Sequence, residues 1–365
     1  MHANASPRLF TPGPLTTCDA VRAAMGRDMG SRDNEFIAMV AEIRSGLLEL
    51  AGTSQEAGYE AIPIQGAGTF AIESMLGSVV GDDATLLVLV NGAYGKRIHS
   101  IAERLGIRSS ILECPENEVH DPQRVEAAIA SGVTHVAAVH CETTTGILNP
   151  IETYAAIAQR AGAVFMVDAM SSFGGYEIDI AALPAAYLVS SSNKCIEGVP
   201  GFGYVIAQRS QLESTRGTAR SVSLDLLAQW EGLERNGQFR FTPPTHVLLA
   251  FHKALAVLAQ EGGVTARAAR YKARNAQVVS GMSALGYEPY ISEALRSHII
   301  TTFRYPEHDF DFEAFYSALA ERGLVIYPGK LTEVDCFRIG NIGALSEKDI
   351  NELLQVVGEL TPTCT

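Results

Sequence analysis

A lysine and an aspartate stand where the strands of a buried sheet would present them for chemistry. Lys194 follows the apolar run YLV and a serine cluster, and it precedes the glycine-rich segment GVPGFG that leads into another apolar run. A lysine in such surroundings tends to lose its proton, and a neutral amine can form a Schiff base with an aldehyde. Asp168 ends the run AVFMVD, where open α/β sheets place their ligand-binding groups. Taken singly, Lys194 could also be a solvated surface charge and Asp168 a helix cap or turn residue.

A glycine-containing turn precedes both residues in the chain. The segment GAGT at Gly66 to Thr69 leads into a helical pattern, and backbone N–H groups at a helix N-terminus bind phosphate readily. The motif alone is weak, because it is neither GxGxxG nor a P-loop and an ordinary strand-to-helix turn fits it as well. A phosphate site, a carboxylate and a buried lysine together are what a pyridoxal phosphate enzyme needs. The combination predicts this cofactor on Lys194, with Asp168 at the pyridine nitrogen.

The elements that must position these residues follow an alternating pattern. From about residue 34 to 260, short apolar runs alternate with helical patterns, which is typical of an α/β layered domain. The expected strands are 86–90, 136–139, 164–167, 187–189 and 202–207. The expected helices include 96–105, a helix capped by Asn149 with Pro150 in its first position and ended by Gly162, 245–262 and 265–285.

The pattern changes beyond about residue 290. The sequence there predicts strands at 298–303, 324–327 and 336–339, a helix at 312–322 and a final helix. This order indicates a small α+β domain. Arg338 lies inside the apolar run CFRIG, where a guanidinium is costly to bury unless it is paired. It could form an internal salt bridge or bind a carboxylate or phosphonate.

Composition narrows the class of protein. The chain has 365 residues, is 47% hydrophobic and carries a net charge of −13, so it can bury a large core and has no basic stripe for nucleic acid. The cysteines are scattered and indicate neither a disulfide scaffold nor a thiolate zinc site, and we expect no metal. The first residues lack the apolar core of a signal peptide, and no stretch approaches the roughly 18 apolar residues of a membrane span. We therefore expect a cytoplasmic protein that acts on small molecules, without nucleic-acid or membrane partners. The six cysteines are Cys18, Cys114, Cys141, Cys195, Cys336 and Cys364.

Several segments together resemble the fold-type I, class V aminotransferases, and within them the branch that acts on 2-aminoethylphosphonate and pyruvate. The likeness covers nearly the whole chain, and the segments are highly specific only in combination. They are TPGPLTT (11–17), DMGSRDNEF (28–36), QGAGTFAIE (65–73), NGAYGKR (91–97), HCETTTGILNP (140–150), VDAMSSFGG (167–175), SSSNKCIEGVPGFG (190–203) and FRIGNIG (337–343).

The resemblance implies a role for each site residue. Tyr94 would stack on the pyridine ring, Thr143 would lie near the ring oxygen, and Arg338 would bind the substrate anion. Thr242 would reach the cofactor phosphate of a neighbouring subunit, so a homodimer with shared active sites is implied. The catalytic residues would be Lys194 and Asp168. The residues implied to bind the cofactor are Gly66, Ala67, Gly68, Thr69, Tyr94, Thr143, Asp168, Asn193, Lys194 and Thr242.

The implied fold is α/β, a fold-type I pyridoxal phosphate transferase with a mostly parallel central sheet in a large domain and a smaller C-terminal α+β domain. Residues 1–20 would form a segment over the active site that packs with the small domain, 21–260 the large domain and 261–365 the small one. One departure is Ala67, since relatives with other amino donors often carry serine there. Fewer phosphate hydrogen bonds are expected, with cofactor binding retained.

The implied reaction is ping-pong transamination that yields phosphonoacetaldehyde and L-alanine, a step of phosphonate degradation. Three alternatives stay open at this stage. The first is a class V aminotransferase for another donor, such as serine or alanine with glyoxylate or pyruvate. The second is a lyase such as a cysteine desulfurase, which needs a reactive cysteine on a mobile loop. The third is a protein of this fold that serves as a binding or regulatory partner, against which an intact Asp168 and Lys194 argue.

Overall fold

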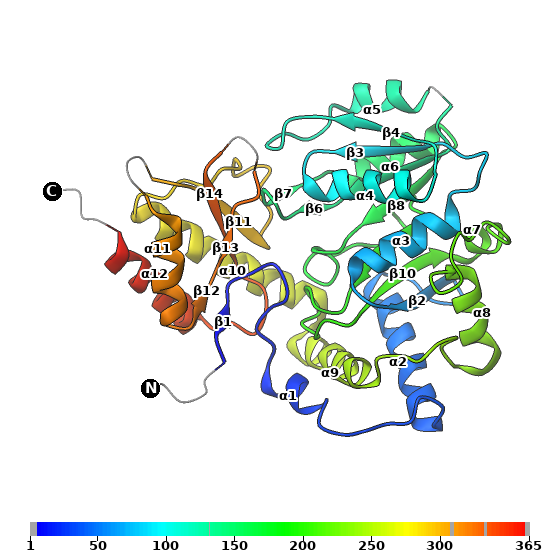
Figure 1. Cartoon of the computed structure of the whole chain (residues 1–365), viewed down its shortest axis with the longest axis horizontal. Helices are drawn as coiled ribbons and strands as arrows, with labels where there is room; N and C mark the ends of the chain where they lie inside the picture. The colour runs from blue at the N-terminus through cyan, green and yellow to red at the C-terminus, as the bar shows by residue number, and fades with distance from the viewer. Residues whose placement is uncertain (1–5, 131, 307–309, 332–333, 362–365) are drawn as a thin grey trace.

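The computed structural model describes residues 6–130, 132–306, 310–331 and 334–361. A seven-stranded sheet is the centre of its larger part, and a three-stranded sheet lies in the smaller part, at the left of Figure 1. β10 runs antiparallel to both of its neighbours, and the other neighbouring pairs are parallel. In spatial order the strands are β2 (Tyr59–Gln65), β10 (Phe202–Gln208), β9 (Tyr187–Ser191), β8 (Val164–Asp168), β5 (His135–Val139), β3 (Leu86–Val90) and β4 (Ser109–Glu113).

Both faces of the seven-stranded sheet are covered by helices. Successive side chains of one strand point to opposite faces of the sheet and pack in different cores. In β5, Val136 and Ala138 pack on the face covered by α2, α6 and α9. Ala137 and Val139 pack on the other face, which α3, α4 and α8 cover. This explains why the strands are continuous apolar runs rather than alternating ones. The helices of this part are α1 (Asp19–Ala23), α2 (Asn34–Leu50), α3 (Gly68–Val79), α4 (Ala93–Arg104), α5 (Pro122–Ile129), α6 (Ile151–Arg160), α7 (Arg209–Glu213), α8 (Leu226–Asn236) and α9 (Thr245–Glu261).

The smaller part forms around a second sheet in the order β11, β14, β13. Its core joins α10, α11 and α12 and includes Phe10 from the N-terminal segment. That segment pairs in parallel with the small part, Arg8 with Leu324 and Leu9 with Val325. The remaining elements are β1 (Arg8–Leu9), the hairpin β6 (Cys141–Glu142) and β7 (Ile147–Leu148), α10 (Gly263–Ala284), β11 (Ile300–Arg304), α11 (Phe312–Glu321), β12 (Leu324–Val325), β13 (Tyr327–Pro328), β14 (Cys336–Gly340) and α12 (Glu347–Leu360).

Most predicted elements are confirmed, and the exceptions have local causes. Asn149 does not cap α6: its side chain donates to Asn91 and to the Val139 carbonyl, and Pro150 occupies the cap position. α4 begins three residues before the predicted position, because apolar periodicity appears only after its first turn. The predicted strand 324–327 is two short strands with different partners, and the strand predicted at 298–303 runs from 300 to 304. β2 and β4 were not predicted.

No single helix within the described ranges is long and apolar enough to cross a membrane, although α9 and α10, bent by 81° at their junction, pass that test when taken together. The predicted domain boundaries at residues 20 and 260 stay a prediction. The ends of the first and last predicted segments, residues 1–5 and 362–365 with Cys364, lie outside the described residues.

Candidate active site

The predicted site residues of the large sheet gather at its carboxyl edge. Asp168 is the last residue of β8, and Lys194 follows β9 after two residues. Tyr94 lies in the first turn of α4, after β3, and Gly68 begins α3, after β2. Because these four strands point the same way, the loops that follow them meet at one edge.

Asp168 is buried and Lys194 is partly buried, and neither forms an ion pair with the described residues. Asp168 is 4% exposed and accepts one hydrogen bond, from the Met170 N–H at 2.9 Å. Burial raises the pKa of Asp168 to about 6, against the Met170 bond and the charge of Lys194, which lower it. Burial also lowers the pKa of Lys194 to about 8. The aspartate can therefore stabilise a cationic ring nitrogen, and the lysine can supply a neutral amine near neutral pH.

The N-terminal segment covers the lysine. Lys194 Nζ donates to the Pro12 carbonyl at 2.8 Å. Gly13, with φ of +123°, packs so closely that a Cβ there would lie 2.8 Å from Lys194 Cδ and 2.8 Å from the Asn193 carbonyl oxygen. Any larger residue would displace the lysine or the loop, so the glycine is required by this contact.

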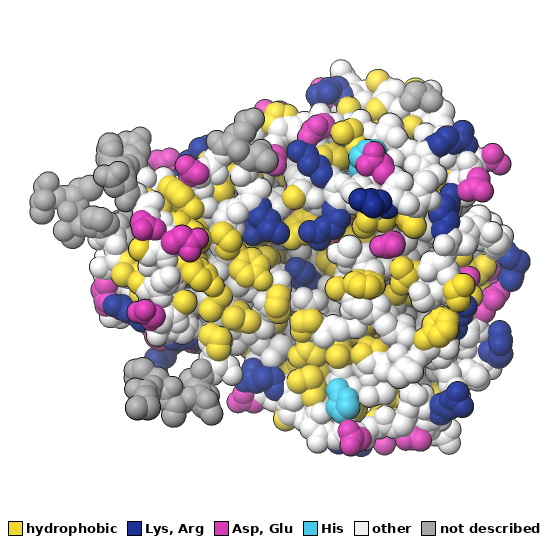
Figure 2. All heavy atoms as spheres, in the orientation of Figure 1, with side chains coloured by type: hydrophobic (Ala, Val, Ile, Leu, Met, Phe, Trp, Pro, Cys, Tyr) yellow, Lys and Arg dark blue, Asp and Glu magenta, His cyan; other side chains and the backbone are white. Residues whose placement is uncertain are grey.

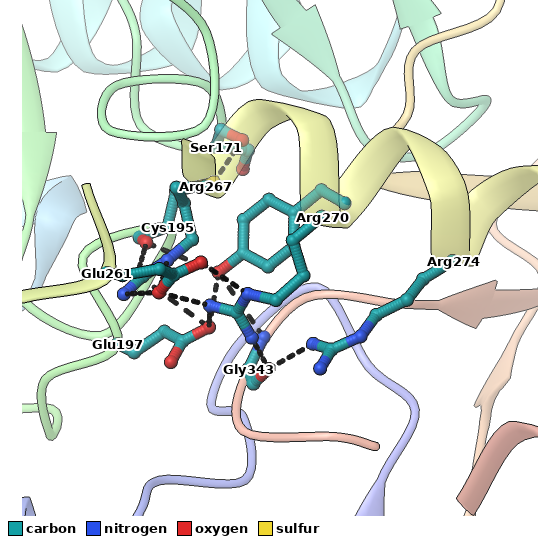
Figure 3. A network of polar contacts seen from close by, with 9 residues as sticks. Ser171, Cys195, Glu197, Glu261, Arg267, Arg270, Arg274 and Gly343 are labelled. Atoms are coloured by element: carbon teal, nitrogen blue, oxygen red, sulfur yellow. Dashed lines mark hydrogen bonds and ion pairs between the residues drawn. The ribbon is translucent and has the colours of Figure 1, made fainter. Parts of the chain in front are cut away.

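The turn that carries Lys194 is fixed from behind by α10 (Figure 3). The Glu197 N–H donates to the Lys194 carbonyl at 2.8 Å, and Arg267 Nη1 donates to the Cys195 carbonyl at 2.6 Å. The Tyr271 hydroxyl donates to Glu197 Oε1 at 2.6 Å, and Arg270 donates to the same oxygen at 2.8 Å. Glu197 has a φ of +65°, a conformation that non-glycine residues rarely adopt, and these bonds hold it there.

The predicted phosphate site is the uncapped start of α3. Ala67 is the N-cap residue and its side chain offers no cap, so the first N–H groups of the helix are available to a ligand. Gly66 has a φ of +116°, and a Cβ on Gly68 would overlap the Met170 thioether. Arg97 donates to Thr69 Oγ1 at 3.4 Å, which places a cation beside this turn. The geometry suits a phosphate group.

Two further predicted residues flank that region. Asn193 lies directly before the lysine and is partly buried. Thr242 is exposed in the loop before α9, and its carbonyl accepts a hydrogen bond from Gln65 Nε2 at 3.2 Å. Thr242 therefore lies beside the end of β2, close in the chain fold to the phosphate turn, with its side chain open to solvent.

Thr143 and Arg338 form the other side of the site. Thr143 is fully buried, and its hydroxyl has no hydrogen-bond partner within the described residues. Its carbonyl accepts from Arg338 Nη1 at 3.0 Å, and Arg338 Nε donates to the Pro328 carbonyl at 3.0 Å. Arg338 is 1% exposed and, in the described parts of the chain, makes no ion pair, so the internal salt bridge considered from sequence is absent there. Burial lowers its pKa from the ordinary arginine value.

Cations converge at the opening of this site. Lys330 is exposed, and burial of part of its side chain together with the charges of Arg338 and Arg97 lowers its pKa. Arg97 also lies over the Tyr94 ring, with its guanidinium carbon 4.9 Å from the ring centre. Lys and Arg side chains gather on the surface between β14 and α4 (Figure 2). A substrate with a doubly charged end fits such a surface.

Glu142 is a site residue that the sequence reasoning did not select. It is fully buried next to Thr143, and burial raises its pKa to about 7. It accepts hydrogen bonds from the Tyr94 N–H at 3.0 Å and from the Thr144 hydroxyl at 2.5 Å. Its place in the segment HCETTTG, directly before Thr143, is the one signal in the sequence that points to it.

The cysteines near the site are unsuited to nucleophilic attack. Cys141 and Cys195 are buried, and burial raises the pKa of the Cys141 thiol to about 12 and that of Cys195 still further above its ordinary value. A reactive cysteine needs a lowered pKa and access to its target. The desulfurase alternative therefore lacks support from either residue.

The arrangement matches the parts of pyridoxal phosphate. The uncapped start of α3 fits the phosphate, the unpartnered Thr143 hydroxyl can bond a ring oxygen, and the Asp168 carboxylate can pair with a ring N–H. Lys194 supplies the amine that binds its aldehyde. The residues present thus fit this cofactor.

Known proteins resemble the chain over nearly its whole length. A family model described as aminotransferase class V matches residues 18–339. A 2-aminoethylphosphonate–pyruvate transaminase of Vibrio vulnificus (strain YJ016) is 49% identical over 354 residues, 96% of this chain and 96% of its own. One of Bacillus cytotoxicus is 49% identical over 356 residues, 96% of this chain and 97% of its own. An alanine–glyoxylate aminotransferase structure from Nostoc sp. shares the fold with a TM-score of 0.89 at 24% identity, over 98% of this chain and 96% of that one.

Proposed function

The chain belongs to the class V aminotransferase family, and from this premise we propose that it transfers the amino group of 2-aminoethylphosphonate to pyruvate. The products are phosphonoacetaldehyde and L-alanine, and the reaction is a step of phosphonate degradation. The observation that carries the proposal is the 49% identity, over 96% of both chains, to a transaminase of that name. The buried, unpaired Arg338 and the cations beside it support a substrate with an anionic end.

Pyridoxal phosphate, when bound, supplies a carbonyl carbon that takes up the amino group and a ring that accepts electrons. Asp168 would keep the ring nitrogen protonated, because a buried carboxylate favours an adjacent cation. Gly68 and Thr69 bind the phosphate through the start of α3. Tyr94, in the first turn of α4, and Thr143, in the turn between β6 and β7, would orient the ring.

Lys194 moves the proton. Lys194 would hold the cofactor through its side-chain amine, and when that amine is free it would accept the proton of the substrate carbon next to the donor nitrogen and give it back. Its lowered pKa, about 8, suits this role because the amine must be able to accept and release a proton near neutral pH. The Pro12 carbonyl, 2.8 Å from Nζ, holds the amine inside the site.

Arg338 binds the anionic end of each substrate in turn. The phosphonate of the donor and the carboxylate of pyruvate both lie away from the reacting nitrogen or carbonyl, so a single guanidinium can serve both half reactions. Its hydrogen bonds to the carbonyls of Thr143 and Pro328 fix its direction without neutralising its charge.

The proposal includes a homodimer whose active sites are shared, in the cytoplasm. Phe70, Val222 and Phe241 are exposed by 51%, 75% and 45%. Three contacts bring the segments that carry them together: a Cβ on Gly66 would lie 2.6 Å from the Phe70 ring, the adjacent Gln65 donates to the Phe241 carbonyl, and Arg240 donates to the Val222 carbonyl. Such an apolar surface beside Thr242 supports association of two copies there. Mixing inactive Lys194→Ala and Thr242→Ala chains tests it: restored activity supports shared sites, whereas no restoration despite mixed dimers contradicts them.

The absorbance spectrum of the holoenzyme tests the function directly. Addition of 2-aminoethylphosphonate should bleach the band of the lysine-bound cofactor, and pyruvate should restore it with formation of alanine. Serine and alanine, with glyoxylate as acceptor, are the matched comparison. Bleaching by serine but not by the phosphonate would overturn the donor assignment, and no bleaching by any amine would overturn the transaminase proposal.

A further inference from the structure

Glu142 joins two parts of the site that lie on different elements. Its Oε2 accepts from the Tyr94 N–H at 3.0 Å, and its Oε1 accepts from the Thr144 N–H at 3.2 Å and the Thr144 hydroxyl at 2.5 Å. The side chain is fully buried, and in the described ranges it forms no ion pair. A carboxylate is seldom buried in this way without a cation, so its position needs a specific reason.

On one side Glu142 fixes the start of α4. The cap residue of this helix, Gly92, has no side chain, and Glu142 supplies the cap from a different segment. A Cβ on Gly92 would overlap the Glu142 carboxyl carbon, so the glycine makes room for it. A carboxylate at a helix N-terminus is also favoured by the helix dipole. The backbone of Tyr94, the residue proposed to stack on the cofactor ring, is thereby held.

On the other side Glu142 fixes the turn between β6 and β7. Its bonds to Thr144 shape that turn, which presents the Thr143 carbonyl to Arg338 at 3.0 Å and the Thr144 carbonyl to the Thr302 hydroxyl at 3.3 Å. Arg338 and Thr302 are paired residues of β14 and β11 in the small sheet. The turn therefore links the small sheet to the large one through Glu142.

We propose that Glu142 is a positioning residue that fixes Tyr94 and Arg338 relative to each other. The residues that would bind the cofactor ring and the substrate anion are thereby held at the correct spacing. This inference rests on the proposed function. An ordinary helix cap would explain the bond to Tyr94 alone, whereas the two bonds to Thr144 and the full burial require the second role.

The ionisation of Glu142 should matter, because a charged carboxylate holds its three donors more strongly than the neutral acid does. Asp168 on β8 and the neighbouring Cys141 face it with acidic groups, and Lys330 and Arg338 face it with cations. Burial raises its pKa to about 7. Below that pH the protonated acid must donate at one oxygen, which removes one of its acceptor positions.

Glu142→Ala and Glu142→Gln test the proposal, with Asp225→Ala as a matched control that removes a side-chain cap from α8 away from the site. In cofactor-free protein, amide hydrogen exchange of residues 92–97 should rise in Glu142→Ala and stay unchanged in the control. In the holoenzyme we expect kcat/KM for the phosphonate to fall about tenfold or more in Glu142→Ala, through a higher KM, because a buried charged hydrogen-bond acceptor is lost.

Glu142→Gln keeps an oxygen for the Tyr94 N–H but places an NH2 group opposite the Thr144 N–H, so it should recover part of that loss, and its similar size makes it the safer variant for folding. We expect KM of the wild type to change near pH 7, and Glu142→Gln should abolish that change. Unchanged exchange at 92–97 in the alanine variant, or a glutamine variant with the wild-type pH profile, would overturn the inference. A wild-type enzyme that does not use the phosphonate would instead overturn the proposed function, and the exchange measurement would still decide the role of Glu142.

Discussion

Lys194 and Glu197 are three residues apart in the sequence but belong to two different groups of charged side chains. The two groups differ in whether their charges are paired. In the active-site group, which consists of Asp168, Glu142 and Lys194, no ion pair forms within the described residues, and burial moves the pKa of each toward neutral pH, to about 6, 7 and 8. In the α10 group Glu197 and Glu261 are bonded to Arg267 and Arg270 at 2.5 to 3.7 Å (Figure 3). Hydrogen bonds from the arginines, against burial, hold the pKa of Glu261 below its ordinary value.

The difference teaches what each group is for. A buried charge that lacks a partner destabilises the free protein. A ligand that supplies the opposite charge, or that exchanges a proton with the group, removes this unfavourable free energy. A buried charge with all of its partners present has nothing left to offer a ligand, and it holds the backbone in place. The active-site group should therefore govern activity, and the α10 group should govern stability.

The largest expected effect is the loss of activity in Lys194→Ala. Removal of the proton-transferring amine should reduce kcat by at least ~10²–10⁴-fold, the usual contribution of general acid–base catalysis. The thermal stability of the cofactor-free protein should not fall, since an unpaired, partly buried cation is removed. Alanine formation and thermal unfolding measure the two effects, with exposed Lys348→Ala as the control. Substantial destabilisation would mean that Lys194 is a structural residue and would break the comparison.

Arg267→Met should show the reverse pattern. Arg267 is fully buried, and its loss leaves Glu197 and Glu261 with fewer partners, so the free energy of unfolding should fall by about 3–5 kcal/mol. Among the folded molecules, kcat should fall far less than in Lys194→Ala. Denaturant unfolding and kinetics per folded enzyme check this, and exposed Arg322→Met is a suitable control. If kcat fell as far as in Lys194→Ala, the α10 group would have to be counted as part of the catalytic machinery.

The sequence predicts the elements that carry a local pattern and misses those that depend on distant contacts. The five predicted strands of the large sheet are buried on both faces, so each is a visible apolar run. β4 lies at the edge with mixed burial, and no such run marks it. Asn149 carries the local signal of a helix cap, but its amide bonds Asn91 from a distant loop instead. Local patterns cannot show contacts of that kind.

The site residues divide in the same way, into those with a local signal in the sequence and those without one. Asp168 ends an apolar strand and Lys194 follows one after two residues, so their positions follow from the rule for parallel sheets. Glu142 caps α4 from 48 residues further along the chain, and the α10 group joins residues more than 60 apart. Nothing near Glu142 in the sequence indicates that it caps a helix. Roles that depend on such long-range hydrogen bonds became visible only in the fold.

The smallest expected effect is a pair of opposite pH dependences in cofactor-free protein. Because burial raises the pKa of Asp168 from 3.8 to about 6, the folded state disfavours its ionised form, and this cost appears as pH rises from 4 to 6. Asp168→Asn should therefore match the wild type near pH 4 and exceed its stability near pH 8, by at most about 3 kcal/mol. Glu261, whose pKa is lowered, should behave oppositely: Glu261→Gln should be less stable than the wild type at pH 8, and the deficit should shrink as pH falls. Denaturant unfolding across pH measures both curves. Curves of the same sign would show that the two carboxylates do not differ in the way the structure implies.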